Sequence, residues 1–235
     1  MSDDLRASLK QAAEWLASNN ASLPLDMAVK MRRAGVFARA AKSGSDYDST
    51  RQTYWEAVYD AVNGYLDSAD RSTAYKSSMK QAVTVAFTEA ANAGYVDGGG
   101  ELPLDEDTDG WLTSQQSSEL ANVDNLFSSL AMLRKQDDTD PIQEAYNRAE
   151  GYSNTLDGLY NQAVLRGAGN KMLTFDGDDG AESCDTCKKL KGQRHRAAWW
   201  IAHDYVPPSG DGLDCAAGGH CQHGLFTDDD EQVTI

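Results

Sequence analysis

All four cysteines and all four histidines of this chain lie in one short segment near its C-terminal end. The first two cysteines, Cys184 and Cys187, form a C-x-x-C motif, and a tight turn with this spacing directs two thiolates toward one point. Cys215 and Cys221 follow, separated by a stretch that contains two adjacent glycines. Four thiolates from two short turns suit a closed, tetrahedral zinc site. The sequence therefore predicts one structural Zn2+ ion bound by Cys184, Cys187, Cys215 and Cys221.

The fourth ligand has rivals, because two histidines flank the last cysteine. Cys221 is favoured, since four thiolates suit structural zinc and the C-x5-C spacing can form a loop around the ion. His223 and His220 are the alternates, and spacing alone does not decide between them. His195 and His203 lie between the cysteine pairs and are expected to be surface or packing residues.

A metal explains how a segment of this size, about Ala181 to Phe226, could fold. So short a piece buries too little apolar surface by itself, whereas zinc contributes on the order of 10 kcal/mol in small modules.

Three other interpretations of the cysteines compete with structural zinc. Two disulfides would need an oxidising compartment, and the acidic N-terminal residues do not resemble an export signal. A thioredoxin-type redox pair would need a C-x-x-C motif at the start of a helix in a βαβ unit, and no such pattern surrounds Cys184. A catalytic zinc, with Glu182 or Asp214 as base, would need an open coordination position.

The rest of the chain, up to about Gly167, has helical periodicity with apolar residues at core spacing. The expected fold class is mainly α: a helical body of about six helices (1–167) followed by a small zinc-stabilised α+β module (168–235). Short apolar pieces such as Met172 to Phe175 predict strands in the module. The helices are expected at residues 3–18, 24–41, 49–66, 72–93, 111–136 and 141–166, with an irregular stretch from Tyr95 to Gly110.

The net charge of −16 makes phosphate backbones and anionic lipids poor partners. No apolar stretch approaches the ~20 residues that a membrane span needs, and we expect synthesis in a cytoplasm. One dense basic run lies in the module, comprising Lys188, Lys189, Lys191, Arg194 and Arg196. It is either a solvated face beside the metal or a docking patch for an acidic protein surface or a nucleic-acid end.

A second, weaker metal pattern precedes the fifth expected helix. Asp105, Asp107 and Asp109, followed by Gly110, match the first half of a calcium loop, but position twelve is Gln116 where a bidentate Glu is needed. Bound Ca2+ is one interpretation of this pattern. The other is an acidic loop whose aspartates favour the start of the following helix.

The C-terminal motif resembles the cysteine module of tailed-phage head-morphogenesis, or minor head, proteins. The resemblance covers about the last sixty residues and rests on Cys184-x-x-Cys187-x-x-Leu190-x-Gly192, Arg196-Ala197-x-Trp199, Pro207-Pro208 and Leu213-x-Cys215-x-x-Gly218-Gly219-x-Cys221. Family members often end in a simpler Pro-x-x-His-Pro-x-Cys-x-Cys pattern. The resemblance implies a structural protein of a virion, assembled in the bacterial cytoplasm, with capsid, portal or scaffold proteins as partners.

Enzymatic activity is not expected, since the chain has no His-Glu-x-x-His, Gly-x-Ser-x-Gly or nucleotide-loop motif. Two rival functions remain open at this point. One is a hydrolase or transferase with a zinc-supported site that uses His220 or His223 with Glu182 or Asp214. The other is binding of a nucleic-acid end through the basic run, which would be sensitive to salt.

Overall fold

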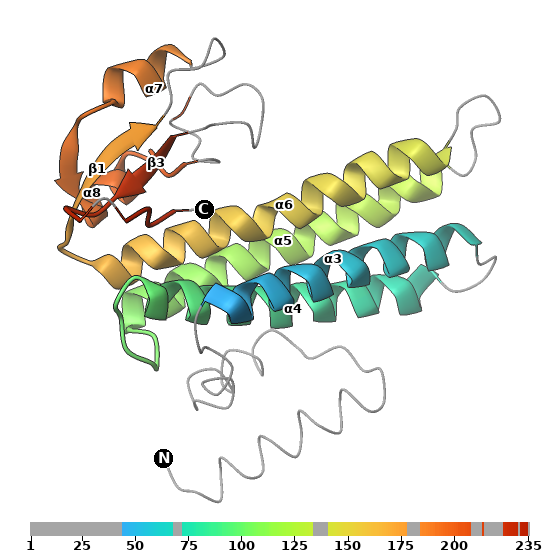
Figure 1. Ribbon diagram of the computed structural model, residues 1–235. Coiled ribbons are helices and arrows are strands. Elements are labelled where there is room, and N and C mark those ends of the chain that lie inside the picture. Colours follow the sequence, from blue (N-terminus) through green and yellow to red (C-terminus); the bar gives the residue numbers. More distant parts are fainter. Residues whose placement is uncertain are drawn as a thin grey trace, which may run out of the picture.

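The computed structural model describes residues 44–67, 72–133, 141–177, 184–207, 213, 223–229 and 231–234. Two of the expected helices, 3–18 and 24–41, lie outside these residues. The described part is mainly α, with six helices and three strands. Four long helices form a bundle, and a smaller module with a three-stranded sheet stands at one end of it (Figure 1).

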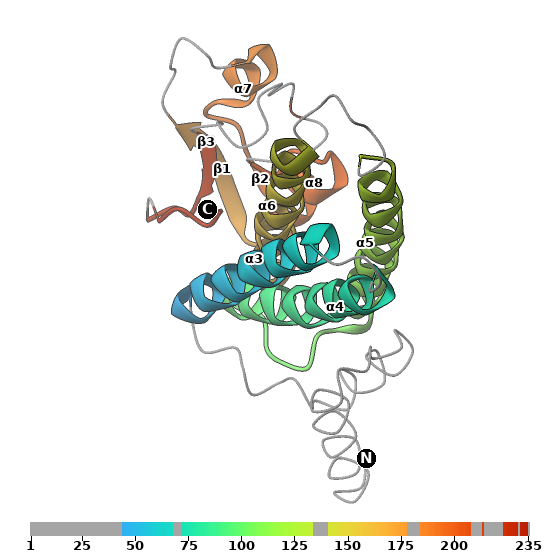
Figure 2. The same cartoon turned by 90° about the vertical axis from the view of Figure 1, so that its right-hand side faces the viewer.

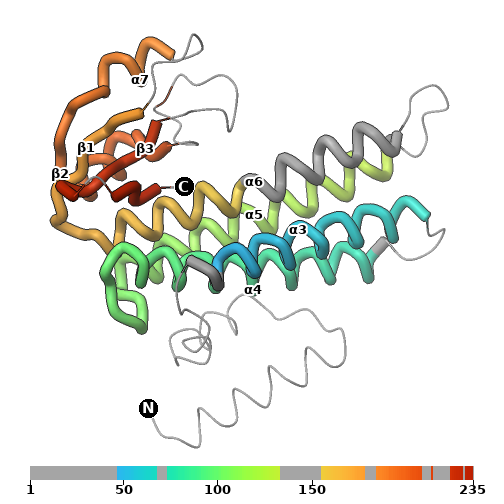
Figure 3. The backbone as a smooth tube through the Cα atoms, viewed as in Figure 1, coloured from blue at the N-terminus to red at the C-terminus, as the bar shows by residue number. Residues whose placement is uncertain are grey.

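The bundle consists of α3 (Gly44–Asp67), α4 (Ser72–Asp97), α5 (Glu106–Leu133) and α6 (Pro141–Ala168). Successive helices run in opposite directions, as expected for helices joined by short connections (Figure 3). Helix α4 contacts the other three, and its contacts with α6 are the most extensive. Pro141 occupies the first position of α6, where its missing N–H costs nothing. No described helix combines the length and the apolar character that crossing a bilayer requires.

Core residues of α3 and α4 lie largely where the helical periodicity predicted them. Tyr54, Val58 and Val62 of α3 are buried, as are Met79 and Val83 of α4. The same periodicity predicts that Trp55 also faces the neighbouring helices, and this is wrong: its side chain is 41% exposed and lies beside Tyr59, with ring centroids 4.3 Å apart. A helix packed on one side has room for only one stripe of core residues, and Tyr54 occupies that stripe at this level.

Helix α4 continues past Gly94, where the sequence predicted its end, to Asp97. A Cβ atom built at Gly94 would lie 2.5 Å from the carbonyl oxygen of Tyr160 on α6. Glycine is therefore present at this position because α6 passes close by, and the helix does not end there. Two further glycines make the same kind of contact: a Cβ at Gly98 would lie 2.0 Å from the Val164 oxygen, and one at Gly167 would lie 2.0 Å from the Tyr95 oxygen.

The irregular stretch between α4 and α5 is shorter than predicted, because both helices extend into it. Its backbone hydrogen bonds begin at the helix end, where Gly98 donates to the Gly94 carbonyl and Gly100 donates to the Tyr95 carbonyl. Gly99 has φ +100°, a conformation that favours glycine. The acidic residues that suggested a loop instead form the first turn of α5, where carboxylates stabilise the positive end of the helix.

The module contains β1 (Met172–Gly177), α7 (Asp185–Leu190), β2 (Arg194–Arg196), α8 (Ala197–Ala202) and β3 (His223–Phe226). The strand predicted from Met172 to Phe175 is confirmed as β1, which is central in an antiparallel sheet of order β2-β1-β3. Helix α8 packs against α6, so the module is attached to the bundle along this helix (Figure 2).

The core of the module is not confined to residues after the predicted boundary at 167/168. Leu165 and Ala168 of α6 belong to the same buried cluster as Leu173, Phe175 and Trp200. Trp200 is fully buried, and its indole N–H donates to the carbonyl oxygen of Leu173 at 3.3 Å. The last turn of α6 therefore serves both parts of the protein.

The described C-terminal residues fold back between the two parts. The Val233 N–H donates to the Leu225 carbonyl at 2.7 Å, and the Leu225 N–H donates to the Thr234 hydroxyl at 3.1 Å. These bonds place Val233 against both the bundle core and the module core. The segment thus connects the two cores by apolar contact.

The carboxylate of Glu119 is buried inside the bundle and lacks a full set of hydrogen bonds. Glu119 of α5 is 6% exposed, and its Oε2 accepts a hydrogen bond from the Asn122 amide at 3.0 Å. No described group bonds its Oε1. By contrast, the amide of Gln116, one turn earlier, donates to both the Thr84 carbonyl and the Thr88 hydroxyl. Burial raises the pKa of Glu119, and the bond from Asn122 offsets this only in part.

We expect Glu119→Gln to stabilise the protein at pH 7 by about 1 kcal/mol, because the substitution removes a charge that is poorly solvated. A raised pKa means that the folded state binds the proton more tightly than the unfolded state. The stability contributed by the protonated side chain is present below the unfolded-state pKa and is lost as the pH rises through the folded-state pKa. Urea unfolding of both proteins at pH 7 and at pH 4 measures this. An advantage of the variant that is equal at both pH values would contradict the explanation.

Candidate metal centre

The first cysteine pair forms a turn at the start of α7. Cys184 has an extended backbone (φ −68°, ψ 161°) and occupies the N-cap position. The backbone N–H of Cys187 donates to the Sγ atom of Cys184 at 3.3 Å, and the Lys188 N–H donates to the Cys184 carbonyl at 3.1 Å. The turn thus gives the Cys184 sulfur a backbone donor, which favours the negatively charged thiolate that binds metal.

Both sulfur atoms belong to the core of the module. Cys187 is fully buried, and Cys184 is partly buried against the same cluster. Burial restricts the access of solvent to the pair and holds the turn in place. The adjacent Lys188 and Lys189 are exposed, so positive charge lies beside the pair without blocking it. The geometry is suited to supplying two of the four ligands of a tetrahedral ion.

The second half of the predicted site lies outside the described residues. This applies to Cys215, Cys221 and His220, and also to the acids Glu182 and Asp214. The alternate ligand His223 is described: it is buried at the start of β3, and its ring stacks on Phe175 with centroids 5.4 Å apart. Within the described ranges, no three His, Cys, Asp or Glu side chains are grouped to hold a metal. His223 therefore does not complete a three-ligand group with Cys184 and Cys187, and the zinc site stays a prediction.

His195 and His203 have packing roles, as the sequence predicted. Both rings stack on Trp199 of α8: the centroid of His195 lies 3.7 Å from that of Trp199, and the centroid of His203 lies 4.0 Å from it. The adjacent Trp200 points into the core instead. Trp199 is partly exposed and belongs to a stack of rings at the surface.

The basic run is exposed, but both of its arginines have partners within the module. The Nη2 atom of Arg194 donates to both carboxylate oxygens of Asp228, at distances of 2.6 and 2.7 Å. Arg196 donates to the Asn170 side chain at 3.0 Å. A cation already paired with a carboxylate contributes less to attracting a phosphate. These contacts weaken the interpretation of the run as a nucleic-acid surface.

The three aspartates of the calcium pattern are positioned by a helix. Asp105 caps α5: its Oδ1 accepts the Thr108 N–H and its Oδ2 accepts the Tyr95 hydroxyl, each at 2.7 Å. Burial acts to raise the pKa of Asp105, but these hydrogen bonds outweigh it and the pKa is lowered. Asp107 and Asp109 lie within α5, and Asp109 is buried. Side chains two positions apart on a helix point in different directions, so the carboxylates do not converge as a calcium loop requires.

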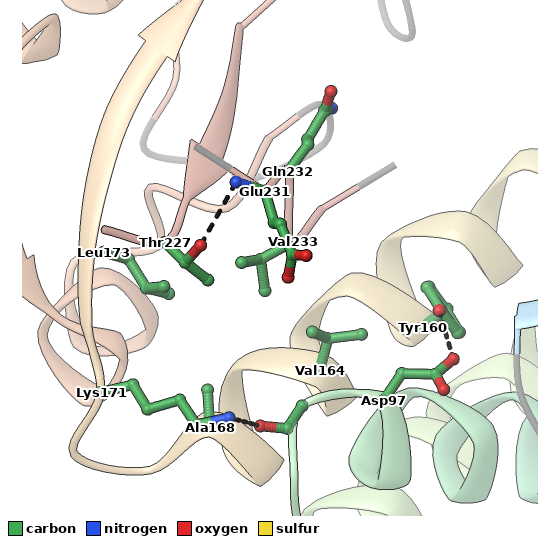
Figure 4. A pocket seen from close by; sticks show the side chains of 11 residues that line it. Asp97, Tyr160, Val164, Ala168, Lys171, Leu173, Thr227, Glu231, Gln232 and Val233 are labelled. Carbon is green, nitrogen blue, oxygen red and sulfur yellow. Dashed lines mark hydrogen bonds between the residues drawn. The ribbon is translucent and has the colours of Figure 1, made fainter. Parts of the chain in front are cut away.

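Sequence reasoning missed a pocket at the seam between bundle and module (Figure 4). Its walls come from the ends of α4 and α6, from β1 and from the described C-terminal residues. The residues that line it include Asp97, Tyr160, Lys171 and Glu231. These residues are far apart in the chain and share no motif. The adjacent Gly98-Gly99-Gly100 was the one signal in the sequence that this region is structurally unusual.

Comparisons with protein-family models, with curated proteins and with solved structures found no match.

Proposed function

We propose that this chain is a non-enzymatic structural protein of a bacteriophage particle, in which one zinc ion holds the C-terminal module in shape for assembly contacts. The proposal combines the cysteine motif, with its resemblance to phage head-morphogenesis proteins, and the local geometry of Cys184 and Cys187. The helical bundle and the module would contact capsid, portal or scaffold proteins near the portal vertex.

The observation that carries the zinc part of the proposal is the hydrogen bond from the Cys187 N–H to the Cys184 sulfur. A sulfur that accepts a backbone N–H is stabilised as thiolate, the form that zinc binds. With Cys187 in the buried cluster, the pair is attached to the sheet and to α6, so a bound ion would fix the segment that follows relative to the bundle. Cys215 and Cys221 are proposed to complete the tetrahedron.

Metal content tests the zinc part directly. Native mass spectrometry of the purified, reduced protein is expected to show one zinc per chain. Cys184→Ser and Cys221→Ser are each expected to lose it and to become sensitive to protease within the module, because zinc contributes on the order of 10 kcal/mol to such folds. His203→Gln, which changes an exposed histidine of the same module, is the matched control and is expected to keep the ion.

Two results would contradict the zinc site. One is a metal-free chain with two intact disulfides, and the other is full zinc retention by Cys184→Ser. The variant His223→Gln tests the identity of the fourth ligand. If this variant loses zinc and Cys221→Ser keeps it, His223 rather than Cys221 is the fourth ligand.

The assembly part needs a separate test. Proteomic analysis of purified particles and of empty precursor heads from the phage that encodes the chain is expected to detect it, with chemical cross-links to capsid, portal or scaffold proteins. Absence of the chain from both kinds of particle, with the protein abundant in the infected cell, would reject a structural role and leave the zinc site untouched.

A further inference from the structure

The pocket at the seam between bundle and module has an apolar floor and a charged rim. Val164 and Ala168 of α6, Leu173 of β1 and Val233 line its interior (Figure 4). Its volume of about 240 Å³ is below the roughly 300–1,000 Å³ of sites for drug-sized molecules and cofactors. The space is suited to a single long side chain rather than to a nucleotide or cofactor.

The rim carries two carboxylates on different walls. Asp97 is the last residue of α4, and Glu231 belongs to the described C-terminal residues; both are exposed. Asp97 accepts the Tyr160 hydroxyl at 2.7 Å, and this bond holds its carboxylate at the pocket (Figure 4). Neither carboxylate forms an ion pair with a lysine or arginine in the described part of the chain.

Backbone dipoles add to the negative potential of this pocket. Helix α4 ends at Asp97 and α6 ends at Ala168, so the carbonyl ends of two long helices meet here. Each such end carries a partial negative charge. The protein already places one cation in this field, because the Lys171 ammonium donates to the Gly98 carbonyl at 2.7 Å. That lysine extends from the segment between α6 and β1 to the residue directly after Asp97, so its ammonium offsets part of the negative potential at this end of the pocket (Figure 4).

We propose that this pocket receives an arginine side chain of a partner protein. The guanidinium would lie between Asp97 and Glu231, where its planar set of donors can bond to both carboxylates. The methylene stem would contact Val164, Leu173 and Val233, which matches the way in which arginine buries its aliphatic part. The pocket is built without the cysteines, so this inference holds whether or not the module binds zinc.

The test is a two-dimensional NMR titration of the full chain, as purified, with the peptide acetyl-Gly-Gly-Arg-Gly-Gly-amide. The matched control peptide has citrulline in place of arginine, which keeps the shape and removes the charge. Arginine peptide is expected to bind with low-millimolar affinity, to shift the amide signals of Gly98, Thr227 and Gln232, and to bind more weakly at high salt. The citrulline peptide is expected to bind at least several-fold more weakly.

Variants locate the site. Asp97→Asn keeps an acceptor for Tyr160, and Glu231→Gln changes an exposed side chain, so both are expected to fold normally. Each should weaken binding of the arginine peptide by about two- to fivefold, as expected for loss of one exposed charge partner. Glu101→Gln, an exposed acid outside the pocket, should leave binding unchanged.

Three outcomes would overturn the inference. The first is equal binding of the arginine and citrulline peptides. The second is binding of the arginine peptide that is unaffected by both pocket variants. The third is binding of free arginine amide without binding of the peptide, since this would assign the pocket to a small soluble cation instead of a protein side chain.

Discussion

Gly167→Ala is expected to destabilise the bundle by about 3 kcal/mol, in spite of the higher helix propensity of alanine. The new Cβ would lie 2.0 Å from the carbonyl oxygen of Tyr95, and a backbone atom cannot rotate away as a side-chain tip can. Helices α4 and α6 would have to separate along their most extensive contact. Gly167 does not have a positive φ, so backbone strain at the substituted residue does not contribute to the loss of stability. The free energy of unfolding in urea measures the effect.

Gly110→Ala is the matched control, because this glycine also lies in a long helix and a Cβ built there has no neighbour within 4 Å. We expect it to stabilise the protein by up to about 1 kcal/mol. Gly98→Ala should behave as Gly167→Ala does, since its Cβ would lie 2.0 Å from the Val164 oxygen. If Gly167→Ala and Gly110→Ala changed stability alike, the close approach of α4 and α6 would be disproved.

Trp200→Ala is expected to cost about 4 kcal/mol, the typical loss for deleting a fully buried tryptophan. Its indole fills the module core beside Phe175, and its N–H satisfies the Leu173 carbonyl at the centre of the sheet. Removal leaves a cavity in the module core and deletes this hydrogen bond. Loss of near-ultraviolet circular dichroism, together with rapid proteolysis of the module, would report this change.

The adjacent tryptophan provides the comparison. Trp199→Ala removes a side chain of the same size from the partly exposed stack with His195 and His203. We expect less than half the loss in free energy that Trp200→Ala causes, because little buried apolar surface is removed. Equal losses for the two variants would mean that the surface stack stabilises the module as much as its core does.

Helical periodicity was sufficient to predict the four described bundle helices to within several residues. It failed where tertiary contacts decide the outcome. Gly94 has the local signature of a helix end, but the proximity of Tyr160 on α6 is the reason for glycine there, and no pattern within one helix contains that information. Trp55 occupies a position next to the core stripe, and only the arrangement of the neighbouring helices decides that it is exposed.

The two metal patterns were predictable to different degrees. The C-x-x-C spacing predicted a turn at Cys184, and the described geometry contains one because this spacing constrains only a few adjacent residues. Alternating aspartates are compatible with either a calcium loop or the first turn of a helix. The hydrogen bonds from Thr108 and Tyr95 to Asp105 favour the helix. The pocket at the seam depends on four separate segments, so local patterns do not predict it.

The shared last turn of α6 has a consequence for how this protein can change during evolution. Leu165 and Ala168 belong to the module core, and Val233 contacts both cores. The module therefore cannot be transferred to another protein without the end of α6. Recombination at residue 168 would join a foreign module to a helix end whose side chains were selected for a different sheet. Inheritance of residues from both sides of that position as one block would preserve the match.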